Sequence, residues 1–348
     1  MHAHVNISHI LLCLMICVSI NGANSGKYEP LSKELVDYLN SRPGMTWKAT
    51  VYPRFKTGAD VSRLLGTKQE PTNLKLSRRP TVSHANSNLP IPESFDAREA
   101  WPHCQTIKKI PDQSSCGSCW VAVGAVTAMS DRLCTVLNEE AYYNVQLSAR
   151  DLLSCCYSCG YGCVGGWVGP AWDFWRDEGI VTGAWYDSNG TCLPYPFAPC
   201  GYHKGHEYEP CPEGLYTTPK CVNKCDKDYG DYAKDKHRAV LSYNVESTVE
   251  SIQREIWING PVEAAFNVYD DFGMYSHGIY QHTYGLIVGG HAVRIIGWGT
   301  ENGTDYWLVA NSWNVDWGEN GFFRILRGKN HCGIESSVVA GIPAKPIT

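Results

Sequence analysis

Apolar residues recur at helical spacing in several short parts of the chain. From Leu31 to Leu39 they lie three or four positions apart, with Ser32 as a candidate cap and Pro43-Gly44 as a stop. Shorter runs of the same kind extend from Ala59 to Leu65 and from Ala171 to Glu178. We expect these three segments to be helices.

Beyond residue 245 the pattern changes to runs rich in β-branched and aromatic residues, which are typical of strands. The predicted strands are Val262 to Val268, His291 to Trp298, Asp305 to Ala310 and Gly321 to Leu326. Helical patterns dominate residues 91–244, amid loops rich in Gly and Cys. A chain of 348 residues with 43% apolar content is therefore expected to form two lobes with a cleft between them.

The first residues carry an apolar run from Ile10 to Ile20, followed by small and polar residues. A run of about 11 residues is too short for a hydrocarbon core that needs about 20, so a membrane anchor is the weaker alternative. Residues 1–22 are predicted to be a secretory signal peptide, and no membrane partner is expected. The polar stretch from Lys68 to Asn88 has no periodicity and is predicted to be a linker.

The net charge of −5 is unevenly distributed. Residues 27–90 contain 11 Lys and Arg against 5 Asp and Glu, a net of +6, so the remainder carries −11. We expect the basic segment to dock on the acidic body and to loosen as carboxylates are protonated in acid. The acidic body disfavours nucleic acid as a partner.

Sixteen cysteines occur, of which fourteen remain when Cys13 and Cys17 leave with the signal peptide. In an oxidising compartment this density indicates a disulfide framework. If one thiol stays free as a nucleophile, parity requires a second free thiol. The spacing alone leaves the connectivity open.

The most specific motif is Gln113-Ser-Ser-Cys-Gly-Ser-Cys-Trp120. The apolar residues after Cys119 indicate a buried helix that begins near it, and a helix N-terminus together with a nearby imidazolium lowers the pKa of a thiol. The side-chain N–H of Gln113 would stabilise a developing oxyanion. This arrangement is that of a thiol nucleophile.

Two downstream segments supply partners for this thiol. They are Gly289-Gly-His-Ala-Val-Arg-Ile-Ile-Gly-Trp-Gly299 and Tyr306-Trp-Leu-Val-Ala-Asn-Ser-Trp313, which contain His291 and Asn311. A histidine exchanges protons with the thiol and the leaving group, and an amide can orient its ring. Catalysis is therefore expected where the helical and β halves meet.

Cys116-Gly-Ser-Cys-Trp120 fits the local signature of papain-like cysteine proteases at every position. Ser94-Phe-Asp-Ala-Arg98, Asn311-Ser-Trp-Asn-Val-Asp-Trp-Gly318 and His331-Cys-Gly-Ile-Glu335 resemble the cathepsin B branch of that family, from about residue 27 to the C-terminus. The resemblance implies an α+β papain-like fold with a helical left lobe (about 91–244) and a β-barrel-like right lobe (about 245–348). It also implies a propeptide at residues 23–90, removed near residues 87–91 to release a mature peptidase of residues 91–348.

As a member of this family the chain would hydrolyse proteins and peptides through an acyl-enzyme, without a cofactor or metal. Its own propeptide and cystatin-type proteins would inhibit it, and it would be lysosomal or extracellular. The implied roles are as follows: Cys119 as nucleophile in an ion pair with His291, Asn311 as orienting group, Gln113 in the oxyanion hole, Trp313 as a shield of the His–Asn bond, and Gly165 and Gly166 as partners of the substrate backbone.

The resemblance further implies a set of six disulfides. They are Cys104–Cys134, Cys116–Cys163, Cys155–Cys221, Cys156–Cys159, Cys192–Cys225 and Cys200–Cys211. Cys332 would then be free, in addition to Cys119.

His291 lies 172 residues after Cys119, whereas about 130–150 is usual for papain-like enzymes. The segment Cys192 to Cys225 is the obvious insertion, and it resembles the occluding loop of cathepsin B, which covers the primed end of the cleft and permits release of C-terminal dipeptides. Two adjacent family histidines that receive the substrate carboxylate fall at Tyr202 and His203. Only His203 remains for this role, with His206 as a possible substitute.

Other departures concern the anchoring of this loop. Asp112 is expected to face Tyr202 instead of a histidine, and a family arginine falls at Tyr208, which removes the ion pair of Asp316. We therefore expect a looser loop, weaker dipeptidyl release and relatively more internal cleavage.

Three further features modify the family pattern. Ser337 stands where the S2 pocket of cathepsin B ends in a glutamate, so apolar P2 residues should be preferred over Arg. Ser114 replaces a glycine and would strain the Gln113 backbone if its φ were positive. One extra residue after Cys119 is expected to be absorbed in the helix as a π-bulge.

Asn189-Gly-Thr191 and Asn302-Gly-Thr304 are acceptor triplets for N-glycosylation. Three alternative functions remain beside the protease. A catalytically weak homologue would serve as a binding protein, a zinc or redox site would use the C-x-x-C pairs that begin at Cys116 and Cys156, and a structural protein would rely on its disulfides alone.

Overall fold

The computed structural model describes residues 27–70, 79–85, 90–122, 124–203, 205–226 and 229–345. The predicted signal peptide, residues 1–22, lies outside this range. We use "N-terminal segment" for the described residues between 27 and 85, and "body" for those from 90 onward.

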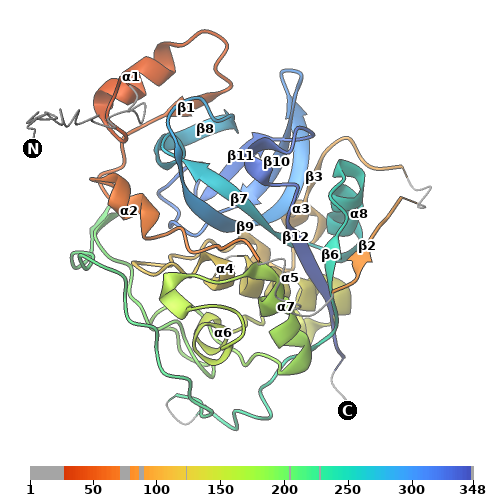
Figure 1. Ribbon diagram of the computed structural model, residues 1–348. Coiled ribbons are helices and arrows are strands. Elements are labelled where there is room, and N and C mark those ends of the chain that lie inside the picture. The colour runs from red at the N-terminus through yellow and green to blue at the C-terminus, as the bar shows by residue number, and fades with distance from the viewer. Residues whose placement is uncertain are drawn as a thin grey trace, which may run out of the picture.

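In the described chain, α-helices predominate between residues 97 and 177 and strands predominate after residue 238 (Figure 1). The α-helices are α1 (Lys33–Ser41), α2 (Gly58–Ser62), α3 (Ala97–Ala100), α4 (Cys119–Ala122), α5 (Ala125–Leu137), α6 (Ala149–Cys155), α7 (Val168–Asp177) and α8 (Val249–Asn259). The strands are β1 (Trp47–Ala49), β2 (Thr81–Val82), β3 (Phe95–Asp96), β4 (Tyr202–His203), β5 (His206–Glu207), β6 (Ala239–Val245), β7 (Val262–Tyr269), β8 (Tyr275–Tyr280), β9 (Ile287–Glu301), β10 (Thr304–Ala310), β11 (Phe322–Leu326) and β12 (Val338–Pro343).

Ten strands form one mixed sheet in the order β1-β8-β11-β10-β9-β7-β12-β6-β2, with β3 paired to β9. Among the described residues this path has two ends and does not close, so the barrel-like description of the right lobe is corrected to an open sheet. Helices and a mixed sheet together make the fold α+β, as predicted. Figure 1 shows α4 to α7 gathered on one side of the sheet.

Each helix and strand predicted from periodicity overlaps an observed element, namely α1, α2, α7, β7, β9, β10 and β11. Ser32 caps α1 by accepting a hydrogen bond from the amide of Leu35. The apolar stretch from Cys119 to Leu137 is long enough to compare with a membrane span, but 88% of its most apolar window is buried inside the body. Such burial is that of a core helix in a folded domain.

The helix after Cys119 is interrupted between α4 and α5. Gly124 donates its amide to the carbonyl of Cys119 at 3.2 Å, five residues back, which is the hydrogen bond of a π-turn. A Cβ at Gly124 would lie 1.9 Å from a carboxylate oxygen of Glu263. The predicted π-type turn is therefore present, and it runs close to the buried carboxylate of Glu263.

The N-terminal segment packs on the body in two places. At one end β1 pairs with β8, and the buried ring of Trp47 contacts Tyr275 and Tyr280 and donates from its indole N–H to the carbonyl of Gln281. At the other end β2 pairs with β6. The prediction of a structureless linker is therefore wrong for residues 79–85, because a two-residue strand carries no periodicity.

Candidate active site

Cys119 lies where the helices meet the sheet. It is the first residue of α4, its side chain is fully buried, and it remains a free thiol. The helix dipole at this position favours a thiolate. The predicted nucleophile thus occupies the position that its motif implies.

His291 and Asn311 come together from neighbouring strands. His291 lies on β9, and its Nε2 is 2.8 Å from Oδ1 of Asn311, just after β10. The ring of Trp313 packs against the imidazole at a tilt of 36° with centroids 5.1 Å apart, and all three side chains are buried. The Trp313 ring therefore shields this hydrogen bond from water.

Gln113 is held firmly beside the thiol. Its Nε2 donates to the carbonyl of Cys116 at 2.7 Å and to that of Leu64 at 3.0 Å, and its Oε1 accepts from the hydroxyl of Ser312. Ser114 does adopt a positive φ of 53°. The expected strain does not displace Gln113, because its side chain is fixed at both ends.

The N-terminal segment crosses this site as an extended chain. The amide of Gly66 donates to Sγ of Cys119 at 3.2 Å, and the hydroxyl of Thr67 lies 3.3 Å from the same atom. Thr67 forms bridges to Gly166 on one side and to Gly290 on the other. A peptide backbone therefore lies on the thiol, between the helical and the sheet halves.

Close packing explains the glycines on this path. A Cβ at Gly66 would lie 1.7 Å from the carbonyl oxygen of Gly117, and a Cβ at Gly165 would lie 2.3 Å from that of Gly66. Gly166 donates its amide to the carbonyl of Gly66 at 2.8 Å. These residues act together as a backbone-binding surface. The sequence prediction missed Gly66 and Thr67. Their only indication in the sequence is that Gly66 directly follows the periodic run from Ala59 to Leu65.

The covered site favours neutral groups. Burial raises the pKa of the Cys119 thiol, although hydrogen bonds from Thr67, Ala292 and Gly66 act in the opposite direction. Burial also lowers the pKa of His291 to about 4, and the hydrogen bond with Asn311 offsets only part of this. With the N-terminal segment in place, a neutral thiol and imidazole are favoured over the ion pair.

His203 is placed differently from the prediction. Its Nε2 lies 3.3 Å from Asp112, its Nδ1 lies 3.1 Å from Asp316, and it is only 3% exposed. The expectation that Asp112 faces Tyr202, and that Asp316 loses its partner, is wrong, because a single imidazole reaches both carboxylates. Both ring nitrogens are engaged, so in this structure His203 presents no free donor to a substrate carboxylate.

Asp112 also receives the N-terminal segment. Arg54 pairs with its carboxylate at 3.2 Å and donates to the carbonyl of Trp313 at 2.9 Å. Both members of the Arg54–Asp112 pair are buried. Asp112 therefore contacts both the predicted propeptide, through Arg54, and the predicted occluding loop, through His203.

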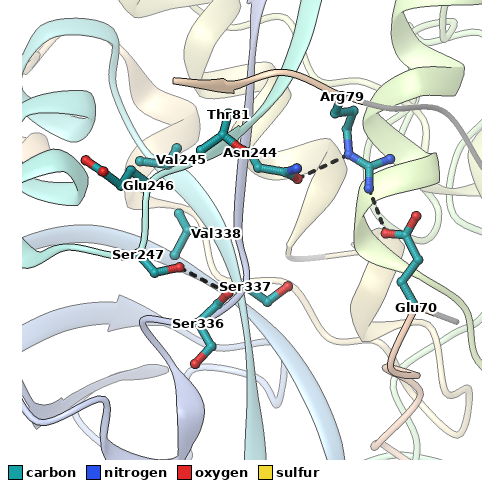
Figure 2. Close-up of a pocket in the computed structure, with 10 residues that line it drawn as sticks. All are labelled: Glu70, Arg79, Thr81, Asn244, Val245, Glu246, Ser247, Ser336, Ser337 and Val338. Carbon is teal, nitrogen blue, oxygen red and sulfur yellow. Dashed lines mark hydrogen bonds and ion pairs between the residues drawn. The ribbon is translucent and has the colours of Figure 1, made fainter. Parts of the chain in front are cut away.

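Ser337 lines an open pocket of about 510 Å³ between the N-terminal segment and strands β6 and β12 (Figure 2). Glu70 and Arg79 of the N-terminal segment lie on one side of it, and Arg79 donates to the side-chain oxygen of Asn244 at 3.3 Å. The body contributes one carboxylate to this pocket, Glu246, which accepts from the hydroxyl of Ser251.

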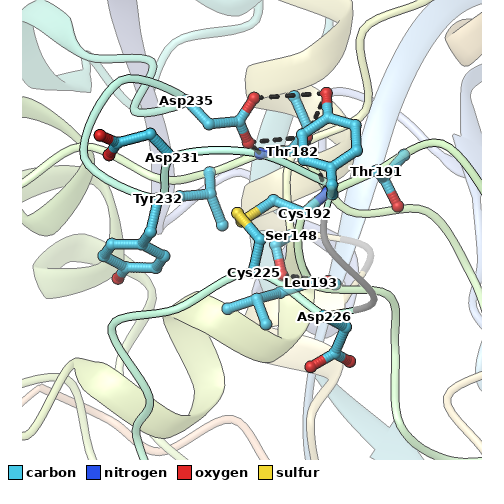
Figure 3. Close-up of a disulfide and its surroundings, with 12 residues drawn as sticks. Ser148, Thr182, Thr191, Cys192, Leu193, Cys225, Asp226, Asp231, Tyr232 and Asp235 are labelled. Atoms are coloured by element: carbon cyan, nitrogen blue, oxygen red, sulfur yellow. Dashed lines mark hydrogen bonds between the residues drawn. A yellow bond between two sulfur atoms is a disulfide. The ribbon is translucent and has the colours of Figure 1, made fainter.

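Crosslinks order the loop around His203. All six implied disulfides are formed, and Cys119 and Cys332 are free. Figure 3 shows the Cys192–Cys225 bond beside Thr182, whose hydroxyl donates to Asp235 at 2.7 Å. The loop has little periodic structure beyond the two-residue strands β4 and β5, so these covalent bonds support the small apolar cluster formed by Val181, Cys192, Leu193 and Cys225. The potential acceptors Asn189 and Asn302 are both exposed.

Among the described residues, the one cluster with metal-ligand geometry is His103, Cys104 and Cys134. Two of these are joined in a disulfide, and a disulfide sulfur is not a thiolate ligand. The zinc alternative therefore has no support in this part of the chain.

The comparison with protein families now gives the class. Residues 91–342 match the family model described as papain family cysteine protease. The chain belongs to this family.

Named relatives narrow the resemblance. The chain is 50% identical over 320 residues to the cathepsin B-like cysteine proteinase of Schistosoma japonicum, covering 92% of this chain and 93% of that protein. It is 51% identical over 318 residues to cathepsin B-like cysteine proteinase 6 of Caenorhabditis elegans, covering 89% and 83%. The predicted branch of the family is thereby confirmed.

Solved structures agree with this placement. Procathepsin B S9 from Trypanosoma congolense superposes with a TM-score of 0.78 at 38% identity, covering 91% of this chain and 100% of that chain. Digestive procathepsin L 3 of Tenebrio molitor, at 21% identity and a TM-score of 0.64, covers 89% and 88% and shares the fold. Both relatives are proenzymes, which accords with an N-terminal segment packed on a protease body.

Proposed function

We propose that this chain is the zymogen of a cathepsin B-like cysteine protease that acts mainly as an endopeptidase. The observation that carries the proposal is the peptide backbone of Gly66 and Thr67, hydrogen-bonded to Sγ of Cys119 and held between Gly166 and Gly290. It is a stand-in for an extended substrate. Removal of residues 23–90 would free the site for substrate proteins, after residues 1–22 have directed secretion to a lysosomal or extracellular location.

The chemistry follows from the residues in place. Once water reaches the site, a proton passes from Cys119 to His291, and the thiolate attacks the scissile carbonyl to form a C–S bond. Gln113 donates to the resulting oxyanion, as it now donates to the carbonyl of Leu64. His291 protonates the departing amine, then takes a proton from the water that hydrolyses the thioester, and Cys119 leaves as thiolate. Asn311 keeps the imidazole of His291 in its orientation through the hydrogen bond to Nε2.

Two details of specificity belong to the proposal. His203 is occupied by Asp112 and Asp316, so a C-terminal carboxylate lacks its receptor and internal cleavage is favoured over dipeptide release. Ser337 brings no charge of its own to its pocket, and the carboxylate that the body contributes there, Glu246, already accepts a hydrogen bond from the hydroxyl of Ser251, so Phe, Leu or Val is preferred over Arg at P2.

The test uses processed enzyme. We expect a peptidyl epoxide to label Cys119 and Cys119→Ala to abolish labelling; absence of labelling in the processed wild type would favour the catalytically weak binding protein. We also expect kcat/KM for Phe-Arg substrates to exceed that for Arg-Arg substrates at least about tenfold, and Ser337→Glu to narrow the gap. Near-equal values in the wild type would contradict the P2 assignment.

A further inference from the structure

The last part of the N-terminal segment lies away from Cys119, on the edge of the sheet. Strand β2 runs parallel to β6, with Thr81 opposite Asn244 and Val82 opposite Val245. The amides of Asn244 and Glu246 donate to the carbonyls of Pro80 and Val82, both at 2.9 Å. Figure 1 shows β2 beside β6 near α8, far from α4 along the sheet.

Side chains add to this backbone pairing. Val82 packs against the main hydrophobic core, and the hydroxyl of Ser83 donates to Glu246 at 2.7 Å. His84 follows, with its Nε2 2.7 Å from Oε2 of Glu255 and its amide donating to the hydroxyl of Ser251 at 3.3 Å. Val82 and His84, two positions apart on an extended chain, share the face that meets the body.

Glu255 is a built receptor for the imidazole. Its carboxylate is fully buried, and its Oε1 accepts from Arg132, Tyr243 and Asn259 at 2.8, 2.7 and 3.1 Å. Burial alone would raise the pKa of Glu255, but Arg132 and the hydrogen bonds from His84 and Tyr243 lower it to about 2. The other oxygen, Oε2, is the one that faces His84.

We propose that the β6 edge and Glu255, beside the pocket that Ser337 lines, form an exosite that binds residues 79–85 independently of the crossing over Cys119. Its ligand class is an extended peptide with a β-branched residue two positions before a histidine. When this tail leaves, β6 is left with unpaired amides at an exposed edge, the geometry that captures an added strand. Because the exosite and the crossing over Cys119 bind parts of the same segment, binding at one raises the effective concentration at the other, and the whole segment binds more tightly than either part.

The first experiment measures binding in trans. A fluorescent peptide of residues 79–85 is titrated into processed enzyme whose Cys119 has been alkylated. We expect saturable binding, weakened about tenfold or more by His84→Ala, because a hydrogen bond to a buried charge is lost. Thr81→Ala changes an exposed side chain and should stay within about twofold. Equal binding of all three peptides, or no binding above a scrambled peptide, overturns the proposal.

The second experiment uses the full chain and hydrogen exchange. In His84→Ala, the amides of Asn244 and Glu246 should exchange faster, while the amide of Gly166, which donates to Gly66 beside Cys119, should keep its protection. If Gly166 loses protection in parallel, the tail and the active-site crossing form one cooperative unit and the exosite is not independent.

Discussion

A single glycine decides whether the N-terminal segment can cover the thiol. Gly66 passes so close to Gly117 that a Cβ would meet its carbonyl oxygen at 1.7 Å, and neither backbone can step aside. Gly66→Ala should therefore loosen the crossing by about 1–3 kcal/mol and accelerate epoxide labelling of Cys119 in the unprocessed chain about 10- to 100-fold. Gly58→Ala is the matched control, since nothing lies within 4 Å of its Cβ position. Equal labelling of the two variants would contradict this role.

The protonation state of Cys119 gives a second prediction at this scale. Because burial raises its pKa while the segment is in place, the unprocessed chain should react with iodoacetamide only above the ordinary thiol range of about 8.5. Processed enzyme should react in mild acid, where the imidazolium is present. Peptide-level mass spectrometry separates Cys119 from the second free thiol, Cys332, whose pKa is raised to about 12. If the unprocessed and processed forms reacted with iodoacetamide with the same pH dependence, Cys119 and His291 would not be a neutral pair beneath the N-terminal segment.

At the scale of elements, one histidine anchors the loop between Cys192 and Cys225. The change His203→Ala removes the ring that lies against both Asp112 and Asp316, so the short hairpin of β4 and β5 should detach. We expect cleavage by an added protease between residues 200 and 211 to become at least about fivefold faster, since loss of a hydrogen bond to a charged group costs about 1.5–3 kcal/mol. His206→Ala, at an exposed position, should leave that rate unchanged. A loop equally resistant in both variants would show that the disulfides alone hold it.

The same loop shows how far sequence reasoning reached. Cys119, His291 and Asn311 were found because each occurs in a motif whose chemistry demands that residue type. The family pattern places His203 in this loop, but a pattern cannot show that its ring turns inward to contact two aspartates distant in sequence. Gly66 and β2 were missed for a related reason, since their roles depend on contacts with residues 117 and 244 and not on periodicity.

At the scale of the whole molecule, the N-terminal segment and the body carry opposite net charges and therefore attract each other. In the sequence, residues 27–90 carry a net charge of +6 and the remainder −11, and two contacts between the N-terminal segment and the body are discrete pairs, Arg54–Asp112 and Arg79–Asp173. The long-range part of this attraction is screened as the Debye length falls from over 10 Å near 0.05 M salt to a few ångströms at 0.5 M. The buried pairs are screened far less.

We therefore expect epoxide labelling of the unprocessed chain to accelerate about five- to tenfold between 0.05 and 0.5 M NaCl and then to level off below the rate of processed enzyme, because the buried pairs persist. Lowering the pH from 7 to 4.5 should act in the same direction, since protonation of carboxylates reduces the negative charge of the body. Processed enzyme under the same conditions corrects for effects on the reaction itself. If the labelling rate changed with neither salt nor pH, the packing of Trp47 and the contacts of Gly66 would be sufficient to bind the segment, and electrostatic attraction would contribute nothing.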